Sequence, residues 1–342
     1  MKKYNLAVVG ATGAVGKTML DILVGRKFPV KEVFAVASAR SAGDFIEFSG
    51  QQIEVHDLDK FDFGDIDIAL FSPGSSVSKI HAPRAAGSGC VVIDNTSQFR
   101  LNPDIPLIIP EVNPESIKDY TKRNIIANPN CSTIQMLLAL KPLHDFSPIK
   151  RVVAATYQAV SGTGTNAIEE LRLQSAQILD NQPTKPVVYP KQIAFNALPQ
   201  IDTFLDNGFT REEMKMHDET RKILNDNSIM VSATAVRIPV FYGHSEAVLI
   251  ETQRSISPDK ARQLLGAAPG VKVVDDPKNS QYPTAVDDAA GNDTISVGRI
   301  RTDISNPNGL WLWIVGDNLR KGAALNSVQI AELLIKNGLQ PK

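Results

Sequence analysis

Short apolar runs alternate with stretches of helical periodicity over the first 127 residues. Strands buried inside a parallel sheet appear as continuous apolar runs, whereas helices carry apolar residues three and four positions apart. This pattern predicts helices at about 14–24 and 76–86, and strands at Leu6–Val9, Val33–Ala37, Ile66–Phe71, Val91–Asp94, Leu107–Ile109 and Asn124–Ala127. Repeated strand–helix–strand units predict an α/β domain whose parallel sheet has helices on both faces.

The pattern changes after Pro129. A helix at 131–144 is followed by longer β-rich runs and by helices at about 166–180 and 210–225. The predicted strands are 151–158, 230–239, 246–253, 271–274, 294–300 and 310–316. Asn166 and Glu169 have the spacing of a capping box, and the buried face of that helix would carry Ile168, Leu171, Ile178 and Leu179. This region predicts an α+β domain with a mainly antiparallel sheet.

The last apolar pattern, 320–337, predicts an amphipathic helix. We expect this helix to return to the first domain, which makes that domain discontinuous in sequence. The expected limits are 1–127 plus 319–342 for the first domain and 128–318 for the second.

Composition narrows the classes of function. The 342 residues suit two domains, and 36 basic against 37 acidic residues give a net charge of −1. That balance argues against bulk binding to nucleic acid or membrane surfaces, which requires a basic field. Two cysteines make neither a disulfide framework nor a metal cluster. Apolar runs are too short for a signal sequence or a membrane span, so we expect a cytoplasmic protein without a bound metal.

A glycine-rich turn joins the first predicted strand to the first predicted helix. It reads GATGAVG at residues 10–16, where glycines allow backbone N–H groups to approach a pyrophosphate. Glycines also serve simple tight turns, but the flanking strand and helix favour a dinucleotide site. The residues that we expect to contact the cofactor here are Gly10, Thr12, Gly13, Ala14 and Val15.

The end of the second predicted strand bears on the choice of cofactor. NAD-binding proteins usually place an acid there to hold the ribose hydroxyls. Here the chain has Ser38, Arg40 and Ser41 and no acid. These residues suit the 2′-phosphate of NADP, although Arg40 could also be a solvated loop residue.

Cys131 is the strongest candidate nucleophile. It follows Pro129 and Asn130 and falls at the start of a predicted helix, where the positive end of the helix dipole stabilises a thiolate and lowers the pKa of the thiol. The alternative is a small buried core residue, which is common for free cysteine. The polar neighbours Asn130 and Ser132 argue against an apolar pocket.

Several separate motifs then occur in one order along the chain: GATGAVG, IDNTSQFR (93–100), NPNCSTIQ (128–135), YQAVSGTG (157–164), EEMK (212–215), RIPVFYGHSEA (237–247) and GDNLRKGAALN (316–326). Together they resemble the aspartate-semialdehyde dehydrogenase family through most of the chain. The resemblance implies a Rossmann-type nucleotide-binding domain plus an α+β catalytic and dimerisation domain, in agreement with the pattern above.

The resemblance also implies a reaction. Such enzymes interconvert β-aspartyl phosphate and aspartate β-semialdehyde with NADP(H) and inorganic phosphate, through a thioester on the cysteine. The product feeds biosynthesis of lysine and diaminopimelate, threonine, methionine and isoleucine. The family further implies a homodimer or a dimer of dimers.

Individual roles follow from the matched motifs. Cys131 matches the nucleophile and His244 the acid–base group, although a lone histidine is more often structural. Gln158 and Asn130 match residues that orient the substrate. Arg237 matches the arginine that binds the substrate carboxylate with its planar fork. Arg100 and Lys215 match the phosphate-binding pair. Glu212 matches an acid that binds substrate or orients Lys215. The residues that match contacts of the nicotinamide are Ser161, Gly162 and Asn318. For Arg100 and Lys215 the alternative is a surface role, more strongly for Lys215.

Three other classes remain open at this point. N-acetyl-γ-glutamyl-phosphate reductase shares the fold and a catalytic cysteine, but its motif typically reads NPGCY, whereas Asn130 and Ser132 flank Cys131 here. Glyceraldehyde-3-phosphate dehydrogenase pairs cysteine with histidine, but its SCTTN motif is absent. A non-enzymatic NADP-binding sensor would keep the glycine turn without needing Cys131, His244 and Arg237 together.

Overall fold

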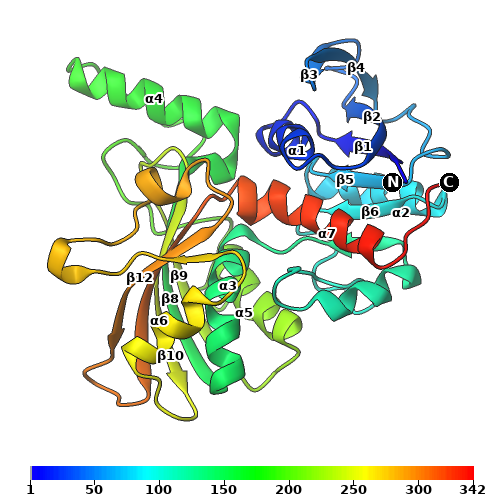
Figure 1. Ribbon diagram of the computed structural model, residues 1–342. Coiled ribbons are helices and arrows are strands. Elements are labelled where there is room, and N and C mark those ends of the chain that lie inside the picture. Colours follow the sequence, from blue (N-terminus) through cyan, green and yellow to red (C-terminus); the bar gives the residue numbers. More distant parts are fainter. Residues whose placement is uncertain (1) are drawn as a thin grey trace. The chain divides into compact units, whose positions relative to one another are not determined.

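The computed structural model describes residues 2–342 and divides into two compact units (Figure 1). The first unit runs to Asn130 and is completed by Ala323–Lys342, and the second is Cys131–Gly322. The sequence predicted that the domains change after residues 127 and 318, a few residues before the observed changes after Asn130 and Gly322. The final segment lies in the first unit, so the second is an insertion within it.

The first unit is built on a seven-stranded sheet with the order β3-β4-β2-β1-β5-β6-β7. All neighbours are parallel except β3, which pairs antiparallel with β4 at one edge. The strands are β1 (Tyr4–Val9), β2 (Val30–Ala37), β3 (Phe45–Phe48), β4 (Gln51–Asp57), β5 (Ile68–Phe71), β6 (Val91–Asp94) and β7 (Ile125–Ala127). The order reverses beside β1, so the carboxyl ends of β1 and β5 border a topological switch point, where such folds bind ligands.

The core of this unit explains its apolar pattern. Every residue of β5 is buried. Successive side chains of a strand point to opposite faces, so both faces of the sheet are covered. The helices are α1 (Ala14–Gly25), α2 (Ser75–Gly87) and α7 (Leu325–Lys336), with a 3-10 segment at Pro114–Lys122. Helices α1 and α7 contact each other, and their apolar residues share one core cluster with the strands.

Three sequence expectations for this unit were incomplete. Strands β3 and β4 were not predicted, because alternating polar residues in a short hairpin give a weak signal. The expected strand at Leu107–Ile109 forms only a single bridge, from Leu107 to Ala127. The predicted terminal helix begins with a π-helical turn, Arg320–Ala324, before α7.

The second unit contains a six-stranded mixed sheet with the order β11-β12-β13-β10-β8-β9. The β8–β9 and β11–β12 pairs are parallel and the other three are antiparallel. The strands are β8 (Ile149–Gln158), β9 (Met230–Arg237), β10 (His244–Thr252), β11 (Val271–Val273), β12 (Ile295–Thr302) and β13 (Gly309–Gly316). Helices α3 (Cys131–Phe146), α5 (Arg211–Leu224) and α6 (Pro258–Gly266) contact these strands, and α3 also contacts α5 and α6.

Helix α4 (Thr165–Leu179) lies apart from the sheet in Figure 1. The residue that caps its start differs from the one predicted. The helix begins after Gly164, without a side-chain cap, so the expected Asn166–Glu169 capping box is wrong. Leu179, expected on the buried face, is 73% exposed. A capping box occurs instead at α5, where Thr210 and Glu213 satisfy each other's backbone N–H groups.

Candidate active site

The glycine turn after β1 packs tightly against neighbouring backbone. Gly10 has a φ of +86°, and a Cβ there would lie 2.7 Å from the carbonyl oxygen of Ser72. A Cβ on Gly16 would lie 2.3 Å from the carbonyl oxygen of Gly10. Both positions therefore require glycine, and the turn leads directly into α1 through Gly13. Such a turn brings backbone N–H groups to the helix start, as phosphate binding requires.

A pocket of about 380 Å³ opens at this turn. It lies at the carboxyl ends of β1, β2 and β4, and its lining consists of Gly10, Thr12, Gly13, Ala37, Ser38, Leu58, Asp59, Ser72, Pro73, Val77 and His81. Ala14 and Val15 follow in the first turn of α1. Arg40 is exposed and Ser41 half-buried, and neither lines the pocket.

Sequence reasoning missed the side of this pocket formed by Asp59 and His81. Oδ1 of Asp59 lies 3.3 Å from Nε2 of His81, and Nη2 of Arg84 lies 3.1 Å from Nδ1 of the same ring. Burial and the nearby Arg84 lower the pKa of His81. Recognition of β4 would have revealed Asp59, because it lies two residues after the end of that strand, at the edge where the glycine turn lies.

Cys131 is the first residue of α3, and its side chain is partly exposed. Gly322 lies against it, because a Cβ on Gly322 would be 2.8 Å from the Cβ of Cys131. The next side chain, Ser132, is buried and accepts a hydrogen bond of 2.9 Å from Nε2 of Gln158. The preceding Asn130 is buried. The cysteine therefore has a polar setting at a helix start, and Cys90, by contrast, is fully buried in the first unit.

His244 is the first residue of β10 and is completely buried. Its Nδ1 accepts a hydrogen bond of 3.0 Å from the backbone N–H of Ala159. Nδ1 therefore carries no proton, and the neutral ring has its proton on Nε2. Nε2 has no hydrogen-bond partner among residues 2–342. Burial, and secondarily Arg237, lower the pKa of His244 to about 3, so the ring is neutral at pH 7.

Arg237 is the last residue of β9 and contacts Ala159, the residue whose N–H bonds to His244. Its Nη1 donates a hydrogen bond of 2.6 Å to the carbonyl oxygen of Ala159, and its Nε has no partner in the described part of the chain. A Cβ on Gly162 would lie 3.1 Å from Nη1 of Arg237 and 3.3 Å from Nε2 of His244. Glycine at position 162 therefore leaves the guanidinium and the imidazole uncovered.

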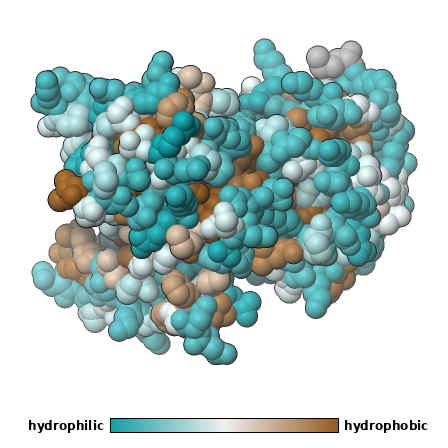
Figure 2. Space-filling model, turned by 90° about the horizontal axis from the view of Figure 1, so that it is seen from below, coloured by the Kyte–Doolittle hydropathy of each residue, from teal (hydrophilic) through white to brown (hydrophobic). Residues whose placement is uncertain are grey.

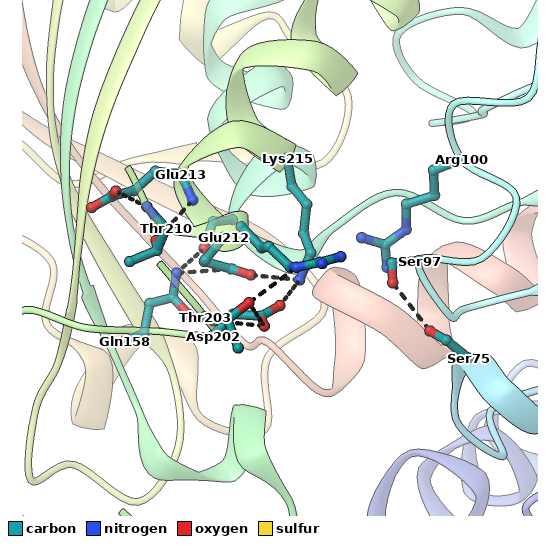
Figure 3. Close-up of polar contacts among 12 residues, drawn as sticks. Ser75, Ser97, Arg100, Gln158, Asp202, Thr203, Thr210, Glu212, Glu213 and Lys215 are labelled. Carbon is teal, nitrogen blue, oxygen red and sulfur yellow. Dashed lines mark hydrogen bonds and ion pairs between the residues drawn. The ribbon is translucent and has the colours of Figure 1, made fainter. Parts of the chain in front are cut away.

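A chain of polar contacts runs from Gln158 to a lysine (Figure 3). Nε2 of Gln158 donates a hydrogen bond of 3.2 Å to Oε1 of Glu212, and the other oxygen of Glu212 lies 3.1 Å from Nζ of Lys215. Asp202, which sequence reasoning missed, contacts the same Nζ at 3.0 Å. Although burial acts to raise the pKa of Asp202, the bond to Lys215 brings it below its usual value. Lys215 is thus held by two carboxylates.

Asn318 connects the turn around Ser161 to the turn that precedes His244. Its Oδ1 accepts hydrogen bonds from the hydroxyl of Ser161, at 3.1 Å, and from the backbone N–H of Gly243, at 3.0 Å. The three residues expected at the nicotinamide are therefore neighbours of His244 in the second unit. Their contact with a cofactor stays a prediction.

Arg100 belongs to the first unit and is buried. Its Nε donates to the carbonyl oxygen of Asn128 at 2.9 Å and its Nη2 to that of Asn95 at 2.8 Å. The surface alternative is therefore wrong for this arginine, and its role toward phosphate stays a prediction. In the same unit Ser75 and Ser97 share a hydrogen bond of 3.1 Å, also drawn in Figure 3.

Two findings concern the molecule's other possible partners. No group of three or more His, Cys, Asp or Glu side chains within residues 2–342 is arranged to hold a metal ion. No helix in that range has the length and apolar character needed to cross a membrane. On the face drawn in Figure 2, hydrophobic residues are interspersed among a majority of hydrophilic ones, as is normal where protein meets water.

Comparison with known proteins decides the family. Residues 5–120 match the family described as "Semialdehyde dehydrogenase, NAD binding domain", and residues 140–321 match "Semialdehyde dehydrogenase, dimerisation domain". An aspartate-semialdehyde dehydrogenase of Legionella pneumophila is 59% identical over 97% of this chain and 96% of its own length. The chain belongs to the aspartate-semialdehyde dehydrogenase family. The family resemblance expected from the motifs is thereby confirmed, and the family's enzymes are oxidoreductases.

Solved structures of aspartate-semialdehyde dehydrogenases agree with the fold. Aspartate semialdehyde dehydrogenase II of Vibrio cholerae, complexed with ASA, has a TM-score of 0.97 and 52% identity, over 99% of this chain and 100% of that one. The structure of aspartate semialdehyde dehydrogenase with NADP from Candida albicans has a TM-score of 0.76 and 25% identity. That match covers 99% of this chain and 100% of the other. The predicted fold, a Rossmann-type domain plus an α+β domain, is confirmed.

Proposed function

We propose that this protein catalyses the NADP-dependent, reversible reductive dephosphorylation of β-aspartyl phosphate to aspartate β-semialdehyde. The observation that carries the proposal is the partly exposed thiol of Cys131 at the first residue of α3, beside the Ser132–Gln158 contact. Backbone N–H groups and the helix dipole stabilise a thiolate at such a position. Membership of the aspartate-semialdehyde dehydrogenase family supports the choice of substrate.

Covalent catalysis by Cys131 divides the reaction into two steps. In the biosynthetic direction the thiolate attacks the acyl carbon of β-aspartyl phosphate, the phosphate leaves, and a thioester forms on the sulfur. NADPH, when bound, supplies the hydride that reduces this thioester. The oxyanion that results expels the thiolate and releases the aldehyde, and the balancing proton ends on the phosphate. In the oxidative direction phosphate displaces the sulfur from the thioester.

His244 serves this chemistry as a neutral hydrogen-bond donor. The Ala159 amide occupies Nδ1, which directs the remaining N–H, on Nε2, toward the substrate oxygen. A fixed donor in a buried site stabilises the negative charge that develops on that oxygen. The reaction as written needs no proton transfer at this oxygen. The acid–base role that the family motif implies for this ring stays a prediction.

The anionic groups of the substrate require fixed cations. Arg237 is buried, and its Nε has hydrogen-bonding capacity that no residue in the range 2–342 uses, so we assign it to the substrate carboxylate. Lys215, oriented by Glu212 and Asp202, is assigned to the phosphate group. Arg100 is assigned to phosphate on the family motif alone.

The cofactor assignment rests on the first unit. Gly10 and Gly16 allow the tight turn that pyrophosphate binding requires, because a Cβ at either position would clash with neighbouring backbone. Ser38 lines the adjoining pocket together with Asp59, and Arg40 and Ser41, which follow Ser38 in sequence, are not acidic. This sequence favours the 2′-phosphate of NADP over the free ribose hydroxyl of NAD. In the cell, the aldehyde product would supply lysine, diaminopimelate, threonine, methionine and isoleucine biosynthesis in the cytoplasm.

A homodimer is part of the proposal. The face of the second unit's sheet that carries Tyr157, Leu249, Trp311 and Trp313 is only half-buried, and the rings of Tyr157 and Trp313 lie 5.6 Å apart. A broad apolar and aromatic face of this kind is typical of an interface between subunits. Residues 140–321, which contain it, match the dimerisation domain of the family. We assign the face to a second copy of this chain.

The test is an assay of the purified protein with aspartate semialdehyde, phosphate and NADP, followed by absorbance of NADPH. We expect turnover that requires phosphate and is faster with NADP than with NAD. N-acetylglutamate semialdehyde is the control substrate. Equal turnover of the two aldehydes, or none with either, would defeat the assignment to β-aspartyl phosphate.

A further inference from the structure

Glu246 is a buried acid to which the mechanism above gives no role. Its side chain is completely buried on β10, and neither carboxyl oxygen has a hydrogen bond within residues 2–342. A buried carboxyl group without hydrogen bonds is destabilising, so the surroundings of Glu246 require an explanation.

The strand places Glu246 on the same face as His244. The two are separated by one residue on β10, and side chains two apart on a strand share a face. In the register of the sheet, His244 lies opposite Gly316 and Glu246 lies opposite Ile314, both on β13. Helix α3 packs on β10 and β13. The carboxyl group therefore lies in the layer between this sheet and the helix that begins with Cys131.

Gln135 is the side chain of α3 that meets Glu246. It lies four residues after Cys131, which puts both residues on one side of the helix. A Cβ on Gly316 would lie 2.9 Å from Oε1 of Gln135, so the amide packs directly over the strand position opposite His244. The Gln135 amide lies close enough to the Glu246 carboxyl to lower the pKa of that carboxyl. Its Nε2 is also buried and without a partner in the described chain.

The charges around Glu246 favour its neutral form. Burial raises the pKa of Glu246 well above its usual value, the Gln135 amide opposes this, and Glu212 of α5 raises it further. The other titratable side chain on this face of β10 is His244, which is neutral for the reasons given above. A protonated carboxyl and a primary amide can exchange two hydrogen bonds, O–H to amide oxygen and amide N–H to carbonyl oxygen.

We propose that Glu246 and Gln135 form a buried pair that fixes the first turn of α3, and with it Cys131, against the end of β10 that carries His244. Glu246 is thus a positioning residue that acts through Gln135. Nucleophile and donor must be held to within a fraction of an ångström for efficient attack, so losing one contact between their two elements lowers turnover. The effect on turnover rests on the proposed function, whereas the effect on the reactivity of Cys131 does not.

The experiment compares four variants of the full chain: Glu246→Gln, Glu246→Leu, Gln135→Leu and the double variant Glu246→Leu/Gln135→Leu. Glutamine at position 246 keeps a neutral group that donates and accepts, so we expect kcat within about twofold of wild type. Each leucine variant should lower kcat by about tenfold or more with little change in KM. The double variant should be no worse than either single one, because both remove the same contact.

A second readout is the rate at which iodoacetamide alkylates Cys131 without substrate, and we expect it to change in the leucine variants but not in Glu246→Gln. Val248→Ala is the matched control, because Val248 is buried two residues further along the same strand and only its packing is removed. If Glu246→Leu does not fold, Gln135→Leu carries the comparison.

Unchanged kcat and alkylation in the leucine variants would overturn the pair, as would equal losses in Val248→Ala or in Glu246→Gln. If wild-type protein lacks the proposed activity, the alkylation rates still decide whether this pair positions Cys131.

Discussion

At His244, one backbone amide determines what a side chain can do. The N–H of Ala159 occupies Nδ1, and complete burial removes the water that would stabilise a charged ring. Sequence reasoning identified this histidine through its motif, but the tautomer depends on a residue 85 positions away in sequence. The chemistry of the ring is therefore a property of the fold around it.

The depressed pKa of His244 makes stability depend on pH. The unfolded ring titrates near 6.5, whereas the native ring titrates at about 3, so the native state binds fewer protons between these values. The stabilisation is fully present above pH 6.5 and is lost as pH falls toward 3. We expect the difference in unfolding free energy between wild type and His244→Asn to fall between pH 7 and pH 4. Urea unfolding at several pH values measures it, and parallel curves would contradict the prediction.

Cys131 should be essential to turnover and dispensable for cofactor binding. Replacement by alanine removes the nucleophile, so we expect Cys131→Ala to lower kcat by about 10⁴-fold or more. The glycine turn and its pocket lie in the other unit and keep their residues. Calorimetric titration with NADP should therefore give a Kd close to that of wild type. Retained activity would remove Cys131 from the mechanism.

Arg237 should be sensitive to a substitution that keeps its charge. Lysine loses the planar fork that binds a carboxylate through two hydrogen bonds. We expect Arg237→Lys to raise the KM for aspartate semialdehyde by about tenfold or more, with a smaller effect on the KM for NADP. Arg172→Lys, at an exposed arginine of α4, is the control for the same substitution. An unchanged KM in Arg237→Lys would contradict the assignment.

At the scale of the element, the residues that cap the helix starts differ from those predicted. The Asn166–Glu169 spacing is that of a capping box, but α4 begins two residues earlier, after Gly164 with a φ of +106°. Spacing alone could not reveal this, because glycine at an unusual φ starts the helix without a side-chain cap. The real box, Thr210–Glu213, has the same spacing and also holds β9, since Glu213 accepts the backbone N–H of Ala235.

The two positions provide a matched comparison of stability. Thr210→Ala removes a side-chain cap at a buried position, and we expect it to lower the unfolding free energy by about 1 kcal/mol. Asn166→Ala changes an exposed residue that caps nothing, and we expect a change within about 0.5 kcal/mol. Thermal unfolding of both variants measures the difference. Equal losses would contradict the assignment of the cap.

The sequence predicted the elements with the strongest periodicity and the residues with the most distinctive motifs. Continuous apolar runs identified β1, β5 and β6, because a strand buried on both faces is apolar over most of its length. The hairpin β3–β4 was missed, and with it Asp59 at the pocket. Asp202 was missed because its contact with Lys215 joins a loop to a helix, and no periodicity records such a contact.

At the scale of the whole molecule, the half-buried face of the second unit's sheet predicts that two copies of the protein associate. Leu249 lies on that face, between Val153 and Trp311 in the sheet register. A charge there would be buried without a partner in a dimer, so we expect Leu249→Glu to yield monomers. Ile80→Glu, at a 67% exposed position in the first unit, is the control and should keep the wild-type mass. Light scattering after size exclusion measures the mass, and a dimeric Leu249→Glu would contradict the proposed interface.

The return of Ala323–Lys342 to the first unit has a consequence for how the protein is made. During synthesis, a ribosome releases every residue of the inserted unit before it releases α7. The first unit cannot close its core until the final segment emerges, because Val328, Ala331 and Leu334 belong to that core, and the hydroxyl of Tyr4 bonds to the carbonyl oxygen of Leu339. The half that carries the thiol can thus mature on the growing chain, while the half that carries the glycine turn waits until α7 has been synthesised.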